Sequence, residues 1–187
     1  QIRAVILRGI GGKSFVSGSD IAQFTAFKDG EDGVRYEKLI DHYLGPLQQL
    51  SMPSIAVIDG LAVGGGLAIA SLCDFRIATP TAKFGVPIAR TLGNTLSPSN
   101  IAWLVAHLGV AIVKRMLLLA ELIPASELHT QGFVYKIGEQ EQLEQMALDL
   151  AEQLSALAPV TQKASKQIMA RVIHHSLPDC SDLIREV

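Results

Sequence analysis

The sequence predicts a single α/β domain in which short buried strands alternate with helices. Runs rich in β-branched residues, such as Ala4–Leu7 and Ser54–Ile58, each end at a glycine-bearing turn, as buried strands commonly do. Stretches with apolar residues at three- and four-residue spacings separate such runs, as expected of helices that cover a sheet. With 187 residues, of which 49% are hydrophobic, the chain can bury one sizeable core, and we expect one domain over residues 1–187.

Further strands and two helices are predicted in the first half of the chain. Phe75–Ala78 and Lys83–Gly85 have the composition of short strands, and the small residues of Leu67–Cys73 predict a closely packed helix. A longer helix is expected over Val34–Leu50, stopped by Met52-Pro53, because its apolar residues form one stripe. The stripe consists of Tyr36, Leu39, Ile40, Tyr43, Leu44, Leu47 and Leu50.

From about residue 98 onward the pattern becomes helical. We expect Gly109 to stop a first helix, an amphipathic helix over Leu143–Leu154, and another helix that starts at Pro159. Between them, Ser126 is expected to cap the start of a short helix and Gly132 to cap its end.

Composition excludes several classes of function. The formal net charge of -2 and the pI near 6.2 give no basic footprint for nucleic acid. Apolar runs such as Ser54–Ile58 and Met116–Ala120 are much shorter than a bilayer span, so no membrane partner is expected. Cys73 and Cys180 lie far apart without metal-ligand spacing, which argues against a disulfide framework and a metal site. We expect a cytoplasmic protein.

The ends of the chain suggest that it is clipped at both. It begins at Gln1 directly ahead of a predicted strand and without an initiator Met. It ends at Val187, within a helix that Leu177-Pro178-Asp179 is expected to begin. Part of the fold is therefore expected to lie outside this sequence.

Two glycine-bearing turns form the candidate site. Ser17-Gly18-Ser19 and Gly64-Gly65-Gly66 each follow a strand-like run, and the second turn also opens a helix. Glycine permits close approach of backbone to a ligand, and a helix N-terminus offers unsatisfied N–H donors with partial positive charge. Such a pair of turns can bind one oxyanion. On composition alone, the alternative is a pair of ordinary turns beside closely packed helices.

Several motifs in order along the chain resemble those of the enoyl-CoA hydratase/isomerase (crotonase) family. They extend over essentially the whole chain, so together they are much more specific than a triple glycine. The motifs are Gly12–Ile21 around Phe15, Gly18 and Asp20, Met52–Gly66 with the triple glycine, Cys73–Ala78, Lys83–Pro87 and Ile123–Val134.

The resemblance implies a crotonase-like spiral of β-β-α turns. The spiral core would cover about residues 1–137 and C-terminal helices about 138–187. The family implies a homotrimer or a dimer of trimers that binds an acyl-CoA substrate, with no cofactor beyond the CoA moiety and no metal. Family chains also have a further β-β-α portion ahead of the point where this sequence begins, and helices beyond its end.

The resemblance also assigns binding roles by position. The backbone amides of Ser19 and Gly65 would form the oxyanion hole, and the Ser17 backbone would meet the CoA adenine. The other residues implied in CoA binding lie in the same turns: Gly18, Asp20, Ile21 and Gly64. An alternative for Asp20 is that its side chain caps the short helix after it.

The sequence departs from the hydratase pattern at both proton-transfer positions. Two glutamates perform this role in a hydratase of the family, and Ala68 and Ile88 stand at the corresponding positions here. Neither side chain can hold a water molecule or move a proton. General acid–base catalysis contributes about 10²- to 10⁴-fold, so the substitutions predict slow hydration of an enoyl-CoA.

The loop Ile88–Ser97 carries polar residues that could substitute. Arg90 could contact an anionic acyl group, and Asn94, Thr95 or Ser97 could hold a water molecule. The alternative is that Arg90 is solvated and Ser97 only caps the next helix. In the family member that dehalogenates aryl-CoA esters, a nucleophilic aspartate occupies the position of Thr95, which cannot act as a carboxylate nucleophile.

Other polar and aromatic side chains are interpreted as structural. Asp74 is expected to hold the turn at a helix end, and His42 to be exposed, although this helix lies near the acyl pocket in some relatives. Trp103 is expected in the core or at a subunit contact. We assign neither Glu121 nor Glu127 to catalysis.

Two functional hypotheses follow. The first is an acyl-CoA enzyme, formally an enoyl-CoA hydratase or isomerase, whose reaction passes through a thioester enolate held by Ser19 and Gly65. The second is a non-catalytic acyl-CoA-binding or assembly subunit that keeps the fold without the proton-transfer groups. A nucleotide-phosphate binder is disfavoured because neither glycine-rich phosphate motif is present.

Overall fold

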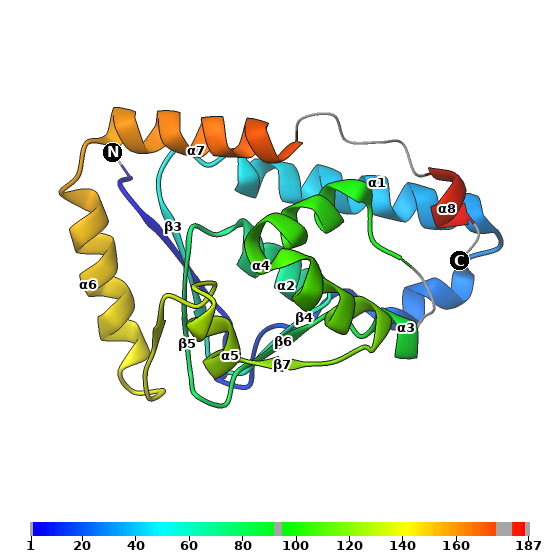
Figure 1. Cartoon of the computed structure of the whole chain (residues 1–187), viewed down its shortest axis with the longest axis horizontal. Coiled ribbons are helices and arrows are strands. Elements are labelled where there is room, and N and C mark those ends of the chain that lie inside the picture. The colour runs from blue at the N-terminus through cyan, green and yellow to red at the C-terminus, as the bar shows by residue number, and fades with distance from the viewer. Residues whose placement is uncertain (1, 92–94, 175–180, 186–187) are drawn as a thin grey trace.

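The computed structural model describes residues 2–91, 95–174 and 181–185, and it contains two four-stranded sheets with helices packed around them (Figure 1). The first sheet is parallel and has the order β1 (Val5–Arg8), β3 (Ser54–Ile58), β5 (Phe75–Ala78) and β8 (Lys136–Ile137). Every residue of β3 is buried, because helices or loops cover both faces of the sheet there.

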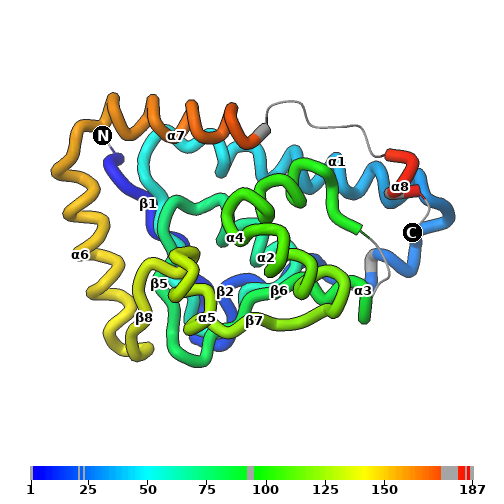
Figure 2. The backbone as a smooth tube through the Cα atoms, viewed as in Figure 1, coloured from blue at the N-terminus to red at the C-terminus, as the bar shows by residue number. Residues whose placement is uncertain are grey.

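The second sheet has the order β2 (Ser14–Val16), β4 (Leu61–Val63), β6 (Lys83–Gly85) and β7 (Ile123–Pro124). Its first three strands are parallel, and β7 pairs with β6 antiparallel. The first six strands thus alternate between the two sheets, and one or more helices follow each pair; β7 and β8, one in each sheet, are separated by α5. The path of the tube in Figure 2 follows this repeat, which agrees with the predicted spiral of β-β-α turns.

Helices of very different length connect and cover the strands. Most of them lie where the sequence predicts a helix, and α6 and α7 begin at the predicted residues. The helices are the 3-10 helix η1 (Ile21–Ala26), α1 (Gly30–Gln48), α2 (Gly65–Leu72), α3 (Ile88–Thr91), α4 (Pro98–Leu118), α5 (Ala125–Thr130), α6 (Leu143–Ser155), α7 (Pro159–His174) and α8 (Ser181–Arg185).

Two apolar cores lie on opposite faces of β3. Ala56 and Ile58 point into the main core, which they share with residues of α2 and α4. Ile55 and Val57 point to the other face, where the buried side of α6 covers the sheet. The alternation has the two-residue period of a strand. The residues of α6 in this second core are Leu143, Ala147, Leu150 and Leu154, as the amphipathic pattern predicts.

A buried arginine in β5 joins the sheet to the end of α2. Arg76 is 6% exposed, and its guanidinium donates to the carbonyl oxygens of Ala70 at 3.0 Å and Phe133 at 2.6 Å, and also to those of Cys73 and Asp74. Burial lowers the pKa of this guanidinium to about 10. The side chain satisfies backbone acceptors that the end of α2 would otherwise leave buried and unpaired.

The longest helix is also the most apolar. By length and composition alone, α4 could cross a membrane, which the sequence analysis did not anticipate. Its backbone leaves helical geometry at Gly109, the predicted stop, so α4 is two helices joined at a kink. Side chains from both halves are buried in the protein, among them Trp103, Leu104, Ile112 and Met116. Because a core helix can have the same length and composition, these features of α4 are weak evidence for a membrane span.

The strands β2, β4, β7 and β8 were not predicted, because runs of two or three residues show no periodicity. The apolar stripe predicted for α1 is wrong in part: Leu39 is 46% and Tyr43 67% exposed, whereas Val34 and Glu37 are buried. The helix starts at Gly30 because Asp29 accepts hydrogen bonds from the first N–H groups.

The cap predicted at Ser126 is also wrong. Helix α5 begins earlier, at Ala125, because the N–H of Ala125 donates to the carbonyl of Ala82 at 2.9 Å, so no side-chain cap is needed. Gly132 follows the last turn of this helix as predicted. The predicted start of the last helix at Leu177-Pro178-Asp179 lies outside the described residues, as does Cys180.

Candidate active site

The two glycine-bearing turns lie side by side at one edge of the second sheet. Strands β2 and β4 are parallel neighbours, so the turns that follow them leave the sheet at the same edge. A β-carbon built on Gly18 would lie 3.6 Å from the Gly65 nitrogen, and one built on Gly65 would lie 3.8 Å from the Gly18 α-carbon. A β-carbon on either glycine would thus be in van der Waals contact with the opposite turn, so the two backbones lie close together.

Backbone geometry at these turns requires glycine. Gly18 has a φ of 94° and Gly64 a φ of 55°, both in the left-handed region. At Gly66 the constraint is space, because a β-carbon there would lie 1.8 Å from the carbonyl oxygen of Val16. Helix α2 begins at Gly65, so the first N–H groups of this helix lie at the junction of the two turns.

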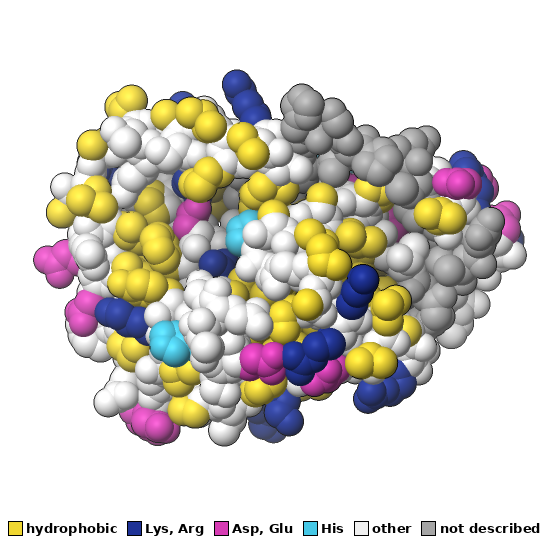
Figure 3. All heavy atoms as spheres, viewed as in Figure 1, with side chains coloured by type: hydrophobic (Ala, Val, Ile, Leu, Met, Phe, Trp, Pro, Cys, Tyr) yellow, Lys and Arg dark blue, Asp and Glu magenta, His cyan; other side chains and the backbone are white. Residues whose placement is uncertain are grey.

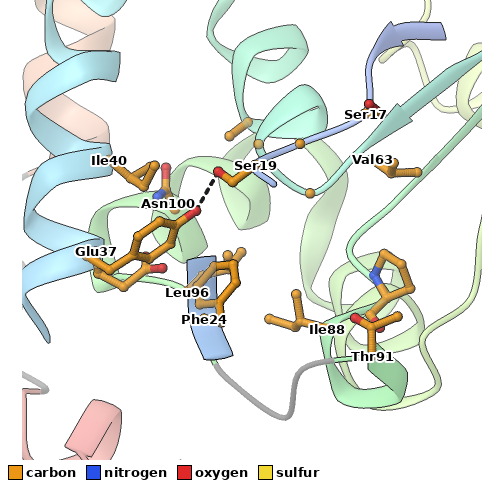
Figure 4. Close-up of a pocket in the computed structure, with 16 residues that line it drawn as sticks. Ser17, Ser19, Phe24, Glu37, Ile40, Val63, Ile88, Thr91, Leu96 and Asn100 are labelled. Carbon is orange, nitrogen blue, oxygen red and sulfur yellow. Dashed lines mark hydrogen bonds between the residues drawn. The ribbon is translucent and has the colours of Figure 1, made fainter. Parts of the chain in front are cut away.

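A cavity of about 200 Å³ opens at this junction (Figure 4). Ser17, Gly18 and Ser19 from the first turn line it together with Gly64 and Gly65 from the second. The structure thus brings together most of the residues expected to bind CoA or the thioester. Much of the remaining lining is apolar and comes from side chains of η1, α1, β4, α2 and the segment after β6, namely Phe24, Ile40, Val63, Ala68, Pro87, Ile88 and Leu96.

Tyr36 connects α1 to the first turn. Its hydroxyl donates a hydrogen bond to Ser19 Oγ at 2.5 Å, the dashed line in Figure 4. The ring packs edge-on against Phe24, with centroids 4.8 Å apart. Burial raises the pKa of the Tyr36 phenol, so the group stays protonated and keeps donating at neutral pH.

Glu37 is the next residue of α1 and lies in the wall of the same cavity. Its side chain is buried, with the residue only 4% exposed, and Oε2 accepts the Ser97 N–H at 2.7 Å. Burial is the main cause that raises the pKa of this carboxyl to about 7, and the negative charge of Asp41 contributes to the same effect. The protein therefore holds a carboxyl group that titrates near neutrality beside the two turns.

Glu37 is not among the candidate residues predicted from the sequence. A signal was present, because Glu37 is three residues before Ile40 and seven before Leu44, within the stripe that was read as purely apolar. An acidic residue at such a position is either buried with a partner or functional. Attention to polar residues inside the predicted stripe would have found it.

Ala68 and Ile88 both line the cavity. Ala68 projects from α2 one turn after Gly65, and Ile88 begins α3 directly after Pro87. In Figure 4, Ile88 and Thr91 lie on one side of the cavity, and Glu37 and Asn100 lie on the other. The two positions at which the sequence lacks glutamates are thus at the cavity wall.

The polar loop residues lie in different places. Arg90 is exposed and donates to the carbonyl oxygens of Leu119 and Ala120, at 3.5 and 3.2 Å, at the end of α4. It does not line the cavity, and neither does Thr95. Thr91 does, with its hydroxyl donating to the Pro87 carbonyl at 3.2 Å. Asn94 lies outside the described residues.

Ser97 caps α4, the structural alternative from the sequence analysis. Its Oγ accepts the Asn100 N–H at 3.3 Å and donates to an Asp41 carboxylate oxygen at 2.8 Å. With the bond from its own N–H to Glu37, Ser97 joins two acidic residues of α1, Glu37 and Asp41, to the start of α4. The N-terminus of α4 therefore faces two carboxyl groups.

Asp20 also has a capping role. Its carboxylate accepts the Ala22 N–H at 2.9 Å and caps η1, which begins at Ile21. Asp74 accepts from the N–H of Ser54 at 2.7 Å and pairs with Lys166 of α7 at 2.6 Å, so it holds the turn as predicted. Neither aspartate lines the cavity between the turns.

The remaining side chains agree with their structural interpretation. His42 is exposed. Trp103 is 9% exposed, and its indole N–H donates to the Ser71 carbonyl at 2.9 Å. Glu121 and Glu127 both pair with Arg115. Within the described ranges, no three His, Cys, Asp or Glu side chains are grouped as a metal site.

A second cavity of about 400 Å³ lies between α7 and the body of the protein, bordered by Trp103, His107, Lys166 and Met169. Charges on the face that Figure 3 shows are mixed in sign, and no basic patch gathers there. Hydrophobic side chains are exposed along α7, including Val160, Ile168 and Val172.

Comparison with known proteins identifies related chains. The model of the enoyl-CoA hydratase/isomerase family matches residues 1–185. The short-chain-enoyl-CoA hydratase of Clostridium acetobutylicum is 36% identical over 171 residues, which are 91% of this chain and 65% of that protein. The (E)-benzylidenesuccinyl-CoA hydratase of Thauera aromatica is 32% identical over 187 residues, 95% of this chain and 68% of that protein.

Solved structures give the same result. An enoyl-CoA hydratase/carnitine racemase from Magnetospirillum magneticum superposes with a TM-score of 0.85 at 29% identity, covering 97% of this chain and 68% of that one. An enoyl-CoA hydratase from Bacillus anthracis superposes with a TM-score of 0.81 at 29% identity, covering 94% and 67%. These likenesses confirm the crotonase-like fold.

The chain is shorter than these relatives. It spans 65% of the Clostridium hydratase and 53% of the rat methylglutaconyl-CoA hydratase, to which it is 29% identical over 170 residues. The family model nevertheless matches nearly every residue, and the fold agrees with it throughout. The chain therefore belongs to the enoyl-CoA hydratase/isomerase, or crotonase, family.

Proposed function

We propose that the chain binds an acyl-CoA thioester with the thioester oxygen between the backbone amides of Ser19 and Gly65, and that it stabilises the enolate formed there. The observation that carries this proposal is the close approach of the two turns, with the Gly18 and Gly65 backbones both at the cavity wall. Two amides aimed at one oxygen stabilise developing negative charge, and each such donor contributes about 10²- to 10³-fold.

The relatives support the class of substrate. Those compared above act, by their names, on CoA thioesters: a short-chain enoyl-CoA, a benzylidenesuccinyl-CoA and a methylglutaconyl-CoA. Their acyl groups differ widely in size and charge. We therefore propose an acyl-CoA as the substrate class and leave the acyl group open.

Efficient hydration is not part of the proposal. A hydratase needs a group that activates water and a group that delivers a proton, and the two positions that would carry them hold Ala68 and Ile88 at the cavity wall. This observation also favours a second candidate function, a subunit that binds acyl-CoA without turning it over.

Two measurements test the proposal. The first uses butyryl-CoA labelled with ¹³C at the thioester carbonyl, whose NMR signal should move downfield on binding because two donors polarise the bond. The second follows exchange of the α-protons in heavy water. A shifted carbonyl with exchange above the buffer rate supports an enolate-forming enzyme, and a shifted carbonyl without exchange supports the binding subunit. Failure to bind, or binding with an unmoved signal, contradicts the carbonyl site.

We also propose a trimer, or a dimer of trimers, as the assembly. Its support is the resemblance to the family and the exposed apolar side chains along α7, such as Val160 at 79% and Val172 at 71%. Light scattering on the purified chain measures the mass directly. A monomer at micromolar concentration would contradict the assembly but not the carbonyl site.

A further inference from the structure

We propose that Glu37 is the residue that moves the proton in this cavity, in place of the glutamates absent at positions 68 and 88. The inference deepens the proposed function and rests on it, because it needs a thioester carbonyl between the two turns. Glu37 comes from α1, whereas the two substituted positions belong to α2 and α3. The carboxyl group at this cavity is therefore supplied by a different helix from those that carry positions 68 and 88.

The placement of Glu37 follows from its neighbour. Tyr36 reaches Ser19 Oγ at 2.5 Å, so this part of α1 is held against the turn that carries one candidate amide. Ile40 follows Tyr36 by four residues and Glu37 by three, so the three side chains share one face of the helix. This face lines the cavity. Figure 4 shows Glu37 extending from α1 on the same side as Asn100.

The contacts of the Glu37 carboxyl leave one of its oxygens available to accept a proton from a ligand. Oε2 accepts the Ser97 N–H, and Oε1 has no hydrogen-bond partner among the described residues. Binding through one oxygen fixes the side chain and leaves the other for a ligand. Much of the cavity lining is apolar and Glu37 itself is buried, and a carboxyl in such surroundings changes its protonation state near neutrality. A general base is most effective when its pKa is close to the working pH.

Few titratable groups of the described residues lie around Glu37. On α1 they are Tyr36, which is neutral, and Asp41, whose negative charge acts on Glu37. Helix α4 presents the uncharged Ser97 and Asn100, and α2 presents Ala68. Helix α8 also packs against α1, but its Arg185 pairs with Glu31 near the start of that helix.

The proton transfer balances without a further reactant. The ionised Glu37 takes a proton from the acyl α-carbon; a C–H bond breaks and an O–H bond forms on the carboxyl. The electron pair moves into the bond between the α-carbon and the carbonyl carbon, and the negative charge passes to the thioester oxygen, where the two amides stabilise it. Return of the proton to the α-carbon gives exchange. With a 3-enoyl-CoA, return at the γ-carbon shifts the double bond into conjugation.

The test compares Glu37→Gln with the wild-type chain in the two assays above. Glutamine keeps an oxygen for the Ser97 N–H but cannot accept the α-proton. We expect α-proton exchange of butyryl-CoA to fall at least about 100-fold, while the dissociation constant and the ¹³C carbonyl shift stay within about threefold. Glu144→Gln, on the exposed face of α6, provides the matched control and should exchange at the wild-type rate.

A second variant separates proton transfer from folding. Asp41→Asn removes the neighbouring negative charge, so the pKa of Glu37 should fall and the midpoint of the exchange rate against pH should move below the wild-type midpoint. A merely structural Glu37 would give no such displacement. Circular dichroism and thermal unfolding show whether each variant is folded.

Each outcome distinguishes the inference from the proposed function. Exchange by Glu37→Gln within about threefold of wild type overturns the role of Glu37 and leaves the carbonyl site intact. Binding and a carbonyl shift without exchange by the wild type also overturn it. If the wild type neither binds butyryl-CoA nor shifts its carbonyl, the proposed function fails and the role of Glu37 fails with it.

Discussion

The Tyr36 hydroxyl donates a hydrogen bond to Ser19 Oγ at 2.5 Å, and this contact joins helix α1 to the turn that carries one of the two candidate carbonyl donors. An amide can polarise a carbonyl only if its turn is held in the correct orientation. The same helix segment carries Glu37. The contact thus relates the position of the proposed base to that of the proposed oxyanion hole.

Tyr36→Phe tests this relationship. The variant keeps the ring packing against Phe24 and removes only the hydroxyl, at a cost of about 1 kcal/mol for one side-chain hydrogen bond. If the bond orients the Ser19 amide, α-proton exchange should fall roughly fivefold and the ¹³C carbonyl shift should shrink. Tyr43→Phe, on an exposed position of the same helix, is the control. Unchanged exchange and carbonyl shift would show that the hydroxyl has no part in positioning the turn.

Gly65→Ala should weaken polarisation of the bound carbonyl, whereas Gly66→Ala should destabilise the fold. The β-carbon at position 65 has room, with its nearest neighbour at 3.8 Å, but it adds a methyl group where the two turns meet. We expect a folded protein with a weakened carbonyl shift. At position 66 the β-carbon would meet the Val16 carbonyl oxygen at 1.8 Å, which should cost about 3 kcal/mol or more in stability.

Urea unfolding and the ¹³C carbonyl shift of bound butyryl-CoA distinguish the two variants. Gly65→Ala should retain most of the wild-type stability, and Gly66→Ala should not. Gly45→Ala, at a position in α1 where an added β-carbon meets no atom within 4 Å, controls for the change itself. A fully active Gly65→Ala protein would contradict the proposed position of the thioester oxygen.

Glu37 should also make stability depend on pH. Its pKa is raised from 4.5 to about 7 in the folded chain, so the folded state binds this proton more tightly than the unfolded state does. Its contribution to stability is then fully present below about pH 4.5 and is lost as the pH rises through about 7. At 1.36 kcal/mol per pKa unit, the loss is roughly 3 kcal/mol.

Urea unfolding of wild type and Glu37→Gln at pH 5 and pH 8 measures this effect. The amide does not titrate, so the difference in unfolding free energy between the two proteins should change in favour of the variant as pH rises. Other titrating groups act equally on both proteins and cancel. A difference that stays constant between the two pH values would mean that the pKa of Glu37 is close to its ordinary value.

The sequence was most informative where the residues are buried and the pattern is long. Ser54–Ile58 is all apolar except for Ser54 and became β3 with the predicted bounds, and the spacing of Leu143, Ala147, Leu150 and Leu154 predicted the buried face of α6. In both cases a local pattern and tertiary burial require the same structure. The triple glycine alone did not predict an oxyanion hole; that prediction also required the other motifs of the family.

Prediction was poorest where a tertiary contact overrides the local pattern. Strands such as β7, with two residues, exist only because a neighbouring strand pairs with them. The start of α5 depends on the distant Ala82 carbonyl rather than on Ser126. Glu37 was overlooked because its burial depends on Ser97, 60 residues away in sequence. No window of local sequence contains these partners.

Arg76 should be essential for stability and irrelevant to the chemistry. Arg76→Met would leave buried carbonyl oxygens without donors, including those of Ala70 and Phe133, and we expect a loss of about 3 kcal/mol. Arg90→Met removes a guanidinium that also donates to carbonyls, but at an exposed site, and should cost less than about 1 kcal/mol. Chemical denaturation measures both losses.

The same Arg90 variant tests whether that arginine contacts an anionic acyl group. Its guanidinium is directed to the end of α4 and does not line the cavity, so affinities for butyryl-CoA and for a dicarboxylic acyl-CoA such as glutaryl-CoA should be unchanged in Arg90→Met. Selective loss of glutaryl-CoA binding would show that the side chain turns toward the ligand.

Hydration of crotonyl-CoA should be slow in the wild type and should respond to a glutamate at position 68. Without acid–base groups at 68 and 88, we expect a rate at least about 10²-fold below that of a hydratase that has both glutamates. Ultraviolet absorbance of the conjugated thioester follows the reaction. A fast wild type would mean that Glu37 or another group already activates water.

A glutamate at position 68 should restore part of the rate. Ala68 lies at the cavity wall one turn after Gly65, so Ala68→Glu places a carboxyl beside the proposed carbonyl site and should raise hydration at least about tenfold. Ala68→Gln, similar in size but unable to ionise, should not raise the rate. Equal rates for the two variants would mean that position 68 does not face the β-carbon of the bound substrate.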